Sequence, residues 1–188
     1  MIAGIILAAG ASTRMGRPKA LLDYRGETFL ARLVRIFARV CDPVLVVLGH
    51  HAEIIQERVD ANFVINPDPD RGQLSSLQTA LVALPAGAEG FLFTPVDSPT
   101  VEEWTVSRLV EEFRPDAIVI PRFNGRRGHP VCVPRSFIPA FLSLAPTEQT
   151  RAAINRHADQ VHYVDVEDAG ILADIDDPAS YHALKGVR

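Results

Sequence analysis

An apolar run at the start of the chain constrains the fold more than any other feature. Residues 3–8 (AGIILA) contain no polar side chain and lead directly into a glycine-containing segment. A run without polar alternation predicts a β-strand that is buried on both faces of its sheet. Such strands need helices around them, so the run favours an α/β fold.

Strand-like apolar runs and helix-like segments alternate along the rest of the chain. Further strands are predicted at residues 43–48, 63–65, 90–94, 117–120, 131–133, 161–166 and 172–175. Helices are predicted at residues 28–40, 51–59, 75–84, 100–113, 136–157 with a break at Pro146, and from residue 177 onward. This order predicts a three-layer α/β/α sandwich with a Rossmann-like, mostly parallel sheet. The run at 131–133 is expected to be an antiparallel strand.

Polar residues mark where three of these helices begin. Thr28 and Asp177 have side chains that suit an N-cap, and Pro178 suits the first turn of the last helix. Gly186 is expected just past the end of that helix. Thr100 is followed three residues later by Glu103, which is the spacing of a capping box.

Size and composition exclude several classes of protein. The 188 residues predict one domain over residues 1–188, since domains usually span about 100 to 200 residues. A net charge of -4 and a pI near 5.8 argue against nucleic-acid or anionic-membrane partners. Cys41 and Cys132 lack CxxC spacing, which argues against a disulfide framework or a zinc site and favours the reducing cytoplasm. No apolar segment approaches the ~18 residues of a membrane span.

A segment rich in glycine and cations follows the first predicted strand. LAAGASTRMGRPKALL, residues 7–22, combines Gly10 and Gly16 with Arg14 and Lys19. Ligands of open α/β sheets bind outside the carboxyl ends of the strands. Glycine turns present backbone N–H groups to phosphate oxygens, and the cations fit a polyphosphate. Neither GxxxxGK[ST] nor GxGxxG is present, which argues against a P-loop or a dinucleotide-binding site.

Carboxylates follow two later strands. Asp97 lies in TPVDSP, residues 94–99, at the sheet edge where the glycine-rich segment is expected. Mg²⁺ binds carboxylate oxygens together with substrate phosphates, so Asp97 is the first candidate metal ligand. ADIDDP, residues 173–178, offers Asp174 and Asp176, which alternation along a strand would place on one side.

Four short motifs together resemble one enzyme family. The pattern LAAGxSxRMGxxK is matched by Leu7, Ala8, Ala9, Gly10, Ser12, Arg14, Met15, Gly16 and Lys19. It resembles the signature of nucleotidyltransferases of the molybdenum-cofactor type, in particular the branch with molybdenum cofactor cytidylyltransferase. The PVDSP turn and RGHPV, residues 127–131, also look like that branch, and GQLSS, residues 72–76, resembles a helix start of the same family. The resemblance extends to about Leu184 and implies the fold of nucleotide-diphospho-sugar transferases.

The resemblance implies roles for individual residues. Lys19 and Arg14 would contact the phosphates of a nucleoside triphosphate, and Lys19 would neutralise charge on the phosphorus under attack. The implied nucleotide contacts are Leu7, Ala8, Ala9, Gly10 and Ser12 in the first motif, and Gly72, Gln73, Ser75 and Ser76 in GQLSS. The two serines also suit a purely structural helix cap.

The same resemblance implies a Mg²⁺ site and an acceptor site. Asp97 would bind Mg²⁺ with a second carboxylate from Asp174 or Asp176; Asp174 is favoured and both stay open. His129 would lie toward the acceptor, with Arg126 and Arg127 as candidate phosphate contacts.

The implied reaction transfers a nucleoside monophosphate, with CTP as favoured donor, to the terminal phosphate of a molybdopterin-type acceptor and releases pyrophosphate. The N-terminal part would bind the nucleotide, the C-terminal part the acceptor, and a molybdoenzyme would receive the product. One alternative is a cytidylyl- or uridylyltransferase acting on a sugar or polyol phosphate. Another is a non-catalytic chaperone for molybdenum cofactor, although Lys19, Asp97 and the C-terminal aspartates are all present.

Overall fold

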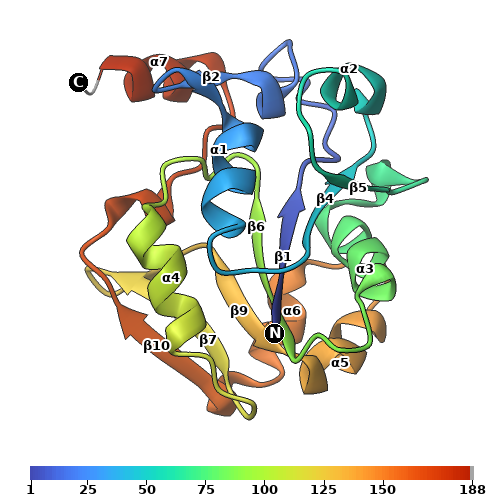
Figure 1. Ribbon diagram of the computed structural model, residues 1–188, viewed down its shortest axis with the longest axis vertical. Coiled ribbons are helices and arrows are strands. Elements are labelled where there is room, and N and C mark those ends of the chain that lie inside the picture. The colour runs from blue at the N-terminus through green and yellow to red at the C-terminus, as the bar shows by residue number, and fades with distance from the viewer. Residues whose placement is uncertain (187–188) are drawn as a thin grey trace.

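The computed structural model describes residues 1–186 and has helices on both faces of a central sheet (Figure 1). The strand order is β10-β7-β9-β6-β1-β4-β5, and β8 pairs with β7. The strands are β1 (Ile2–Leu7), β4 (Val44–Leu48), β5 (Asn62–Ile65), β6 (Gly90–Pro95), β7 (Ile118–Phe123), β8 (Arg126–Arg127), β9 (Val131–Pro134) and β10 (Val161–Asp165). Strand β9 runs antiparallel to both β6 and β7, whereas β1 is parallel to β4 and β6. The predicted mostly parallel sheet with an antiparallel strand is confirmed.

The helices occupy the two outer layers. They are α1 (Phe29–Phe37), α2 (Ala52–Gln56), α3 (Gln73–Ala83), α4 (Glu103–Glu111), α5 (Ile138–Leu142), α6 (Thr150–Asn155) and α7 (Pro178–Gly186). A small hairpin joins β2 (Asp23–Tyr24) to β3 (Glu27–Thr28). No helix within residues 1–186 is long and apolar enough to cross a membrane.

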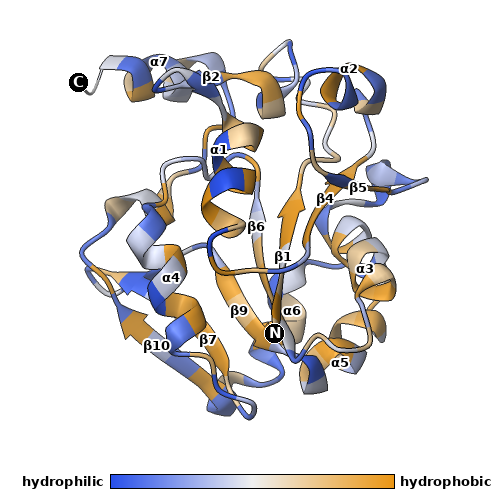
Figure 2. Ribbon diagram, viewed as in Figure 1, coloured by the Kyte–Doolittle hydropathy of each residue, from blue (hydrophilic) through white to orange (hydrophobic). Residues whose placement is uncertain are grey.

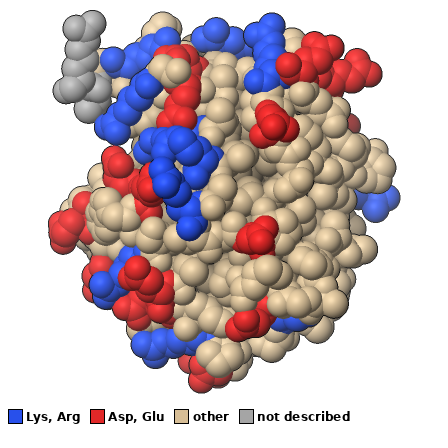
Figure 3. All heavy atoms as spheres, viewed as in Figure 1, with Lys and Arg blue, Asp and Glu red and all other residues tan. Residues whose placement is uncertain are grey.

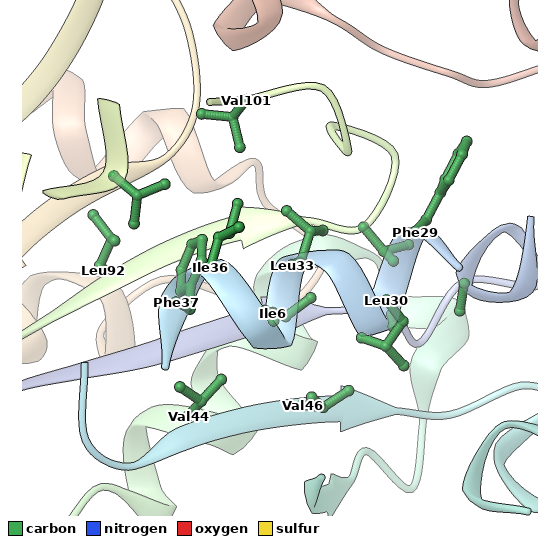
Figure 4. Packing of buried hydrophobic residues seen from close by; sticks show 14 of the residues in the cluster. Ile6, Phe29, Leu30, Leu33, Ile36, Phe37, Val44, Val46, Leu92 and Val101 are labelled. Atoms are coloured by element: carbon green, nitrogen blue, oxygen red, sulfur yellow. The ribbon is translucent and has the colours of Figure 1, made fainter. Parts of the chain in front are cut away.

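Strand β1 is buried on both faces, as its apolar run predicts. Ile6 belongs to the core cluster that contains α1, and Ile5 belongs to the cluster on the opposite face that contains α3. Figure 2 shows β1 and β4 as continuously apolar, and Figure 4 shows Ile6 beneath Leu30 and Leu33 of α1. Burying each such side chain stabilises the fold by roughly 1.5 to 3 kcal/mol, so β1 holds the two outer layers together.

Charges on the outer surface are paired between helices. Figure 3 shows cationic and acidic side chains side by side over the region of α1 and α4, and few charges over α3. Arg35 of α1 lies 2.6 Å from Glu27 and 3.3 Å from Glu103 of α4. Such exposed pairs contribute little to stability individually.

Two of the predicted N-caps are confirmed. The Thr28 side chain accepts a hydrogen bond from Ala31 N at 3.1 Å, and Asp177 Oδ1 accepts one from Ser180 N at 2.8 Å. Gly186, in contrast, is the last residue of α7 in the described chain and does not lie past its end.

The predicted capping box is wrong. Helix α4 starts two residues later than its motif suggests, with Glu102 as N-cap. The Thr100 hydroxyl donates instead to Gly170 O at 3.1 Å, and the Glu102 N–H is bound by Asp168. A partner distant in sequence has replaced the local one.

The predicted strand at 172–175 is also wrong. A 3-10 helix, Ala169–Leu172, is followed by irregular chain as far as α7. The backbone of this segment bonds to the turn after β6 and forms no strand pairing within residues 1–186: Ile175 N donates to Asp97 O at 2.9 Å, and Ser98 Oγ donates to Ala173 O at 3.0 Å.

Gly128 leaves no room for a side chain beside this segment. A Cβ at Gly128 would lie 2.1 Å from Ile171 O, a backbone atom that cannot yield. We expect Gly128→Ala to lower the free energy of unfolding by about 1 to 3 kcal/mol in urea titrations. Gly87→Ala is the matched control, because nothing lies within 4 Å of its Cβ position. Equal stability of the two variants would contradict the expectation.

Candidate functional site

The carboxyl ends of two neighbouring strands define the site. Leu7, the last residue of β1, is in register with Pro95, the last residue of β6. The segment after β1 and the turn after β6 therefore leave the sheet side by side. This register brings Lys19 to Asp97, although 78 residues separate them.

The segment after β1 folds into a compact loop that holds Lys19. Ser12 and Gly16 adopt left-handed backbone conformations, with φ of 54° and 73°. The Ser12 carbonyl accepts hydrogen bonds from Met15 N and Gly16 N at 3.0 and 3.1 Å. The Ser12 hydroxyl accepts one from Lys19 N at 3.1 Å. The serine of the motif thus positions the backbone of the lysine.

The Lys19 ammonium lies between two carboxylates. Its Nζ is 3.0 Å from Asp97 Oδ2 and also donates to Asp176 Oδ1, while Arg14 donates to Asp176 Oδ2 at 2.7 Å. Burial by itself would lower the pKa of Lys19, but the charges and hydrogen bonds of Asp97 and Asp176 outweigh it and raise that pKa. Lys19 therefore remains a cation at neutral pH.

Asp174 completes a cluster of three carboxylates. Asp97, Asp174 and Asp176 each offer an oxygen within 4.8 Å of the others. Burial and the charges of Asp97 and Asp176 raise the pKa of Asp174. Burial would also raise the pKa of Asp176, but Lys19 and Arg14 more than reverse this and lower it. Converging carboxylate oxygens are the donor set that hard divalent cations prefer, so these residues fit a metal ion.

The predicted nucleotide residues line a pocket of about 250 Å³ beside this cluster. The predicted phosphate and nucleotide contacts that line it are Leu7, Ala8, Ala9, Gly10, Ser12, Arg14, Lys19, Gly72, Gln73 and Ser76. Asp97 and Asp176 of the carboxylate cluster line it as well. Ser75 does not line the pocket: its hydroxyl donates to Gly72 O at 2.8 Å and accepts from Asn66 Nδ2 at 2.9 Å. Ser75 caps no free backbone N–H, because the N-cap of α3 is Gly72 and no side chain caps it.

A second pocket, of about 570 Å³, adjoins the first. Gly72 and Gln73 line both pockets, and Arg127 and His129 line the second. Phe93 and other apolar side chains form part of its wall. Asp174 lies in a third pocket, of about 300 Å³, which shares Gln73, Asp97 and His129 with its neighbours.

His129 is held as a neutral ring between these pockets. Burial lowers its pKa, against opposing effects of the Asp97 charge and of a hydrogen bond with the Phe93 backbone. Its Nδ1 is buried and has no hydrogen-bond partner within residues 1–186. Its ring packs edge-on against Phe93 with centroids 5.7 Å apart.

Sequence reasoning missed two supporting residues. Arg32 is 7% exposed and donates to Pro99 O at 2.8 Å and Val101 O at 3.1 Å, which fixes the turn that carries Asp97. Asn66 donates to both Ser75 Oγ and Ser76 Oγ. The sequence signal for Arg32 was its place on the apolar face of α1, three residues after Phe29 and four before Ile36.

Comparison with known proteins identifies the family. The model of the MobA-like NTP transferase domain matches residues 4–161. The chain belongs to this family. It is therefore a nucleotidyltransferase, as the four motifs suggested.

Two curated relatives match nearly the whole MobA-like chain. Molybdenum cofactor cytidylyltransferase of Escherichia coli is 30% identical over 186 residues, which cover 96% of this chain and 94% of the relative. Nicotine blue oxidoreductase of Paenarthrobacter nicotinovorans is 30% identical over 188 residues, covering 93% and 92%. The family scaffold thus also occurs in a protein named for a different chemistry.

One solved structure that is similar to this chain contains a divalent metal. A Mycobacterium tuberculosis H37Rv protein, crystallised as a complex with manganese, superposes with a TM-score of 0.84 at 25% identity. The superposition covers 100% of this chain and 99% of that protein. Together with the three clustered carboxylates, it points to a divalent cation in this family member.

Proposed function

We propose that this MobA-like protein transfers a nucleoside monophosphate from CTP to the terminal phosphate of a molybdopterin-type acceptor. The observation that carries the proposal is the convergence of Lys19, Arg14 and Asp97 on one pocket between the first loop and the PVDSP turn. The Escherichia coli relative, named a molybdenum cofactor cytidylyltransferase, supports the choice of donor and acceptor.

The chain's cations do the chemical work that two reacting anions require. Attack of a phosphate on the α-phosphorus brings two negative groups together and needs no protein nucleophile. Lys19 and Arg14 supply positive charge where the triphosphate would lie, and loop N–H groups after β1 add donors. Positioning and charge neutralisation therefore account for the catalysis.

We assign Mg²⁺ as the divalent metal that the carboxylates would hold. Asp97 and either Asp174 or Asp176 would be its protein ligands, and bound Mg²⁺ would neutralise and orient phosphate oxygens. Lys19 and Arg14 pair with two of the same carboxylates, Asp97 and Asp176. The protein's own cations and the metal therefore compete for Asp97 and Asp176.

The acceptor would occupy the larger pocket. Its volume of about 570 Å³ suits a ligand of drug size. Gln73 lies at the junction with the nucleotide pocket, and Arg127 offers positive charge to the acceptor's phosphate. A molybdoenzyme as the receiver of the product and a cytoplasmic location complete the proposal.

Pyrophosphate release tests the proposal. We expect turnover with CTP and molybdopterin to exceed that with GTP, UTP or ATP, and to exceed turnover with sugar or polyol phosphates. Preference for a sugar phosphate would move the enzyme to another acceptor class, and silence with every pair would favour a cofactor chaperone. Because one relative is named an oxidoreductase, a further arm measures oxidation of a reduced nicotinamide cofactor, where we expect no reaction.

Removal of divalent cations is expected to abolish turnover without unfolding the protein. A chelator would remove the ion that neutralises the phosphates, and added Mg²⁺ or Mn²⁺ would restore pyrophosphate release. Far-UV circular dichroism should show that the protein stays folded, because Lys19 and Arg14 pair with the carboxylates, and the melting temperature should fall only by the contribution of the lost metal binding. Full turnover in excess chelator would contradict the metal assignment.

A further inference from the structure

Asp168 is a buried carboxylate whose hydrogen-bond partners lie in two different elements. It is 5% exposed. Its Oδ1 accepts a hydrogen bond from Gly170 N at 2.8 Å, within its own segment. Its Oδ2 accepts from Glu102 N at 2.9 Å and from Thr105 Oγ1 at 2.6 Å, at the start of α4. The carboxylate therefore ties the chain after β10 to the N-terminus of α4.

The segment that begins at Asp168 carries two of the three clustered carboxylates. Residues 169–176 pair with no strand in the described chain; individual hydrogen bonds, among them one from His129 N to Ile171 O at 2.9 Å, and the burial of Ile171 hold them in place. Ile175 N donates to Asp97 O at 2.9 Å, and Ile175 stands between Asp174 and Asp176 in the chain. The backbone of Asp97 thus fixes the middle of the segment, and Asp168 fixes its start.

Gly170 packs against the turn after β6 with no room for a side chain. A Cβ at Gly170 would lie 2.4 Å from Thr100 O, and the Thr100 hydroxyl donates to Gly170 O at 3.1 Å. Ile171, next in the chain, is 1% exposed and belongs to the core. Through its bond to Gly170, Asp168 therefore helps to hold the residues that follow in the segment.

We propose that Asp168 is a positioning residue of the catalytic site. Its carboxylate anchors residues 169–176 and thereby holds Asp174 and Asp176 against Asp97 and Lys19. The consequence for metal binding rests on the proposed function. Asp168 acts through the segment and touches neither substrate nor metal; partners of this indirect kind typically change metal affinity by about 10- to 100-fold when mutated.

Asp168→Asn tests the anchoring without any metal. The amide keeps the shape of the side chain but turns one acceptor into a donor, so one set of bonds is lost. We expect hydrogen exchange at the Ile175 amide to become about tenfold faster relative to the Ile5 amide of β1, the effect of losing one hydrogen bond to a charged group. Thr28→Ala is the control: it removes the N-cap of α1 and should leave the Ile175 to Ile5 ratio unchanged. An unaltered ratio in Asp168→Asn would overturn the proposal.

A double-mutant cycle tests the link to the metal. We expect Asp168→Asn to weaken Mn²⁺ binding about tenfold by calorimetry and to lower kcat more than it changes KM for the nucleotide. In an Asp176→Asn background the same change should weaken Mn²⁺ binding much less, because the two residues act through one segment. Equal effects in both backgrounds would overturn the proposal. If the wild-type protein neither binds Mn²⁺ nor releases pyrophosphate, the proposed function fails, and the exchange ratio alone decides the anchoring role.

Discussion

Lys19→Met is expected to lower turnover on the order of 100-fold or more, because it removes the cation closest to the reacting phosphates. Methionine is unbranched and one atom shorter than lysine, so it keeps most of the side chain and removes the charged ammonium group. The same variant should bind Mn²⁺ more tightly than the wild type in the absence of nucleotide. The ammonium that occupies Asp97 and Asp176 in the free protein no longer competes with the metal. Pyrophosphate release and calorimetric Mn²⁺ titration measure the two effects.

Lys185→Met is the matched control for this variant. Lys185 is the chain's other lysine and lies 4.8 Å from the ring centroid of Tyr181 on α7, away from the candidate site. It should leave both turnover and Mn²⁺ affinity unchanged. If Lys19→Met kept full turnover, the assignment of the first loop to the triphosphate would be wrong. If it lost turnover and also bound Mn²⁺ more weakly, the competition between lysine and metal would be wrong.

Asp97→Asn is expected to lower turnover to a similar extent, on the order of 100-fold, but with the opposite effect on the metal. It removes the proposed central ligand, so Mn²⁺ binding should weaken strongly. The fold should persist, because Asp97 contributes its backbone carbonyl, not its side chain, to the contact with Ile175. Asp70→Asn serves as control, since the Asp70 side chain is 81% exposed and pairs only with His50 among the ion pairs of the described chain.

The two variants are most informative together. Both predict a loss of turnover, which a general disturbance of the pocket would also produce. Only a shared site for ammonium and metal predicts that Lys19→Met raises Mn²⁺ affinity while Asp97→Asn lowers it. A change of the same sign in both would contradict the arrangement proposed here.

Much of the fold could be predicted from local pattern. The apolar run at residues 3–8 predicted a doubly buried strand, and the chain forms one at Ile2–Leu7. The short apolar run at residues 131–133 predicted an antiparallel strand, found as β9. These predictions succeed because a strand buried on both faces can tolerate few polar residues, so its environment is visible in its own composition.

The candidate site was predictable to a smaller extent. Topology predicted that residues following β1 and β6 would meet, and Lys19 and Asp97 do. The choice between Asp174 and Asp176 could not be made, because the segment that carries them is not a strand and alternation does not apply to it. In the structure Asp176 pairs with Lys19 and Arg14, while Asp174 stands more exposed in the same cluster.

The failed predictions share one physical cause. Thr100 and the segment 172–175 each carry a local signal, but each takes its hydrogen-bond partner from elsewhere in the chain. A polar group near a helix start gains as much free energy from a distant acceptor as from an adjacent N–H, provided that the fold brings the acceptor close.

The sequence by itself determined the alternation of buried strands and covering helices, the family, and the identity of the charged residues at the sheet edge. Only the tertiary structure decided which oxygens Lys19 and Arg14 occupy, and that Asp168 anchors the last carboxylates. The burial of a strand is determined by the hydrophobicity of its own residues. The pairing of charges depends on distances that exist only after the chain has folded.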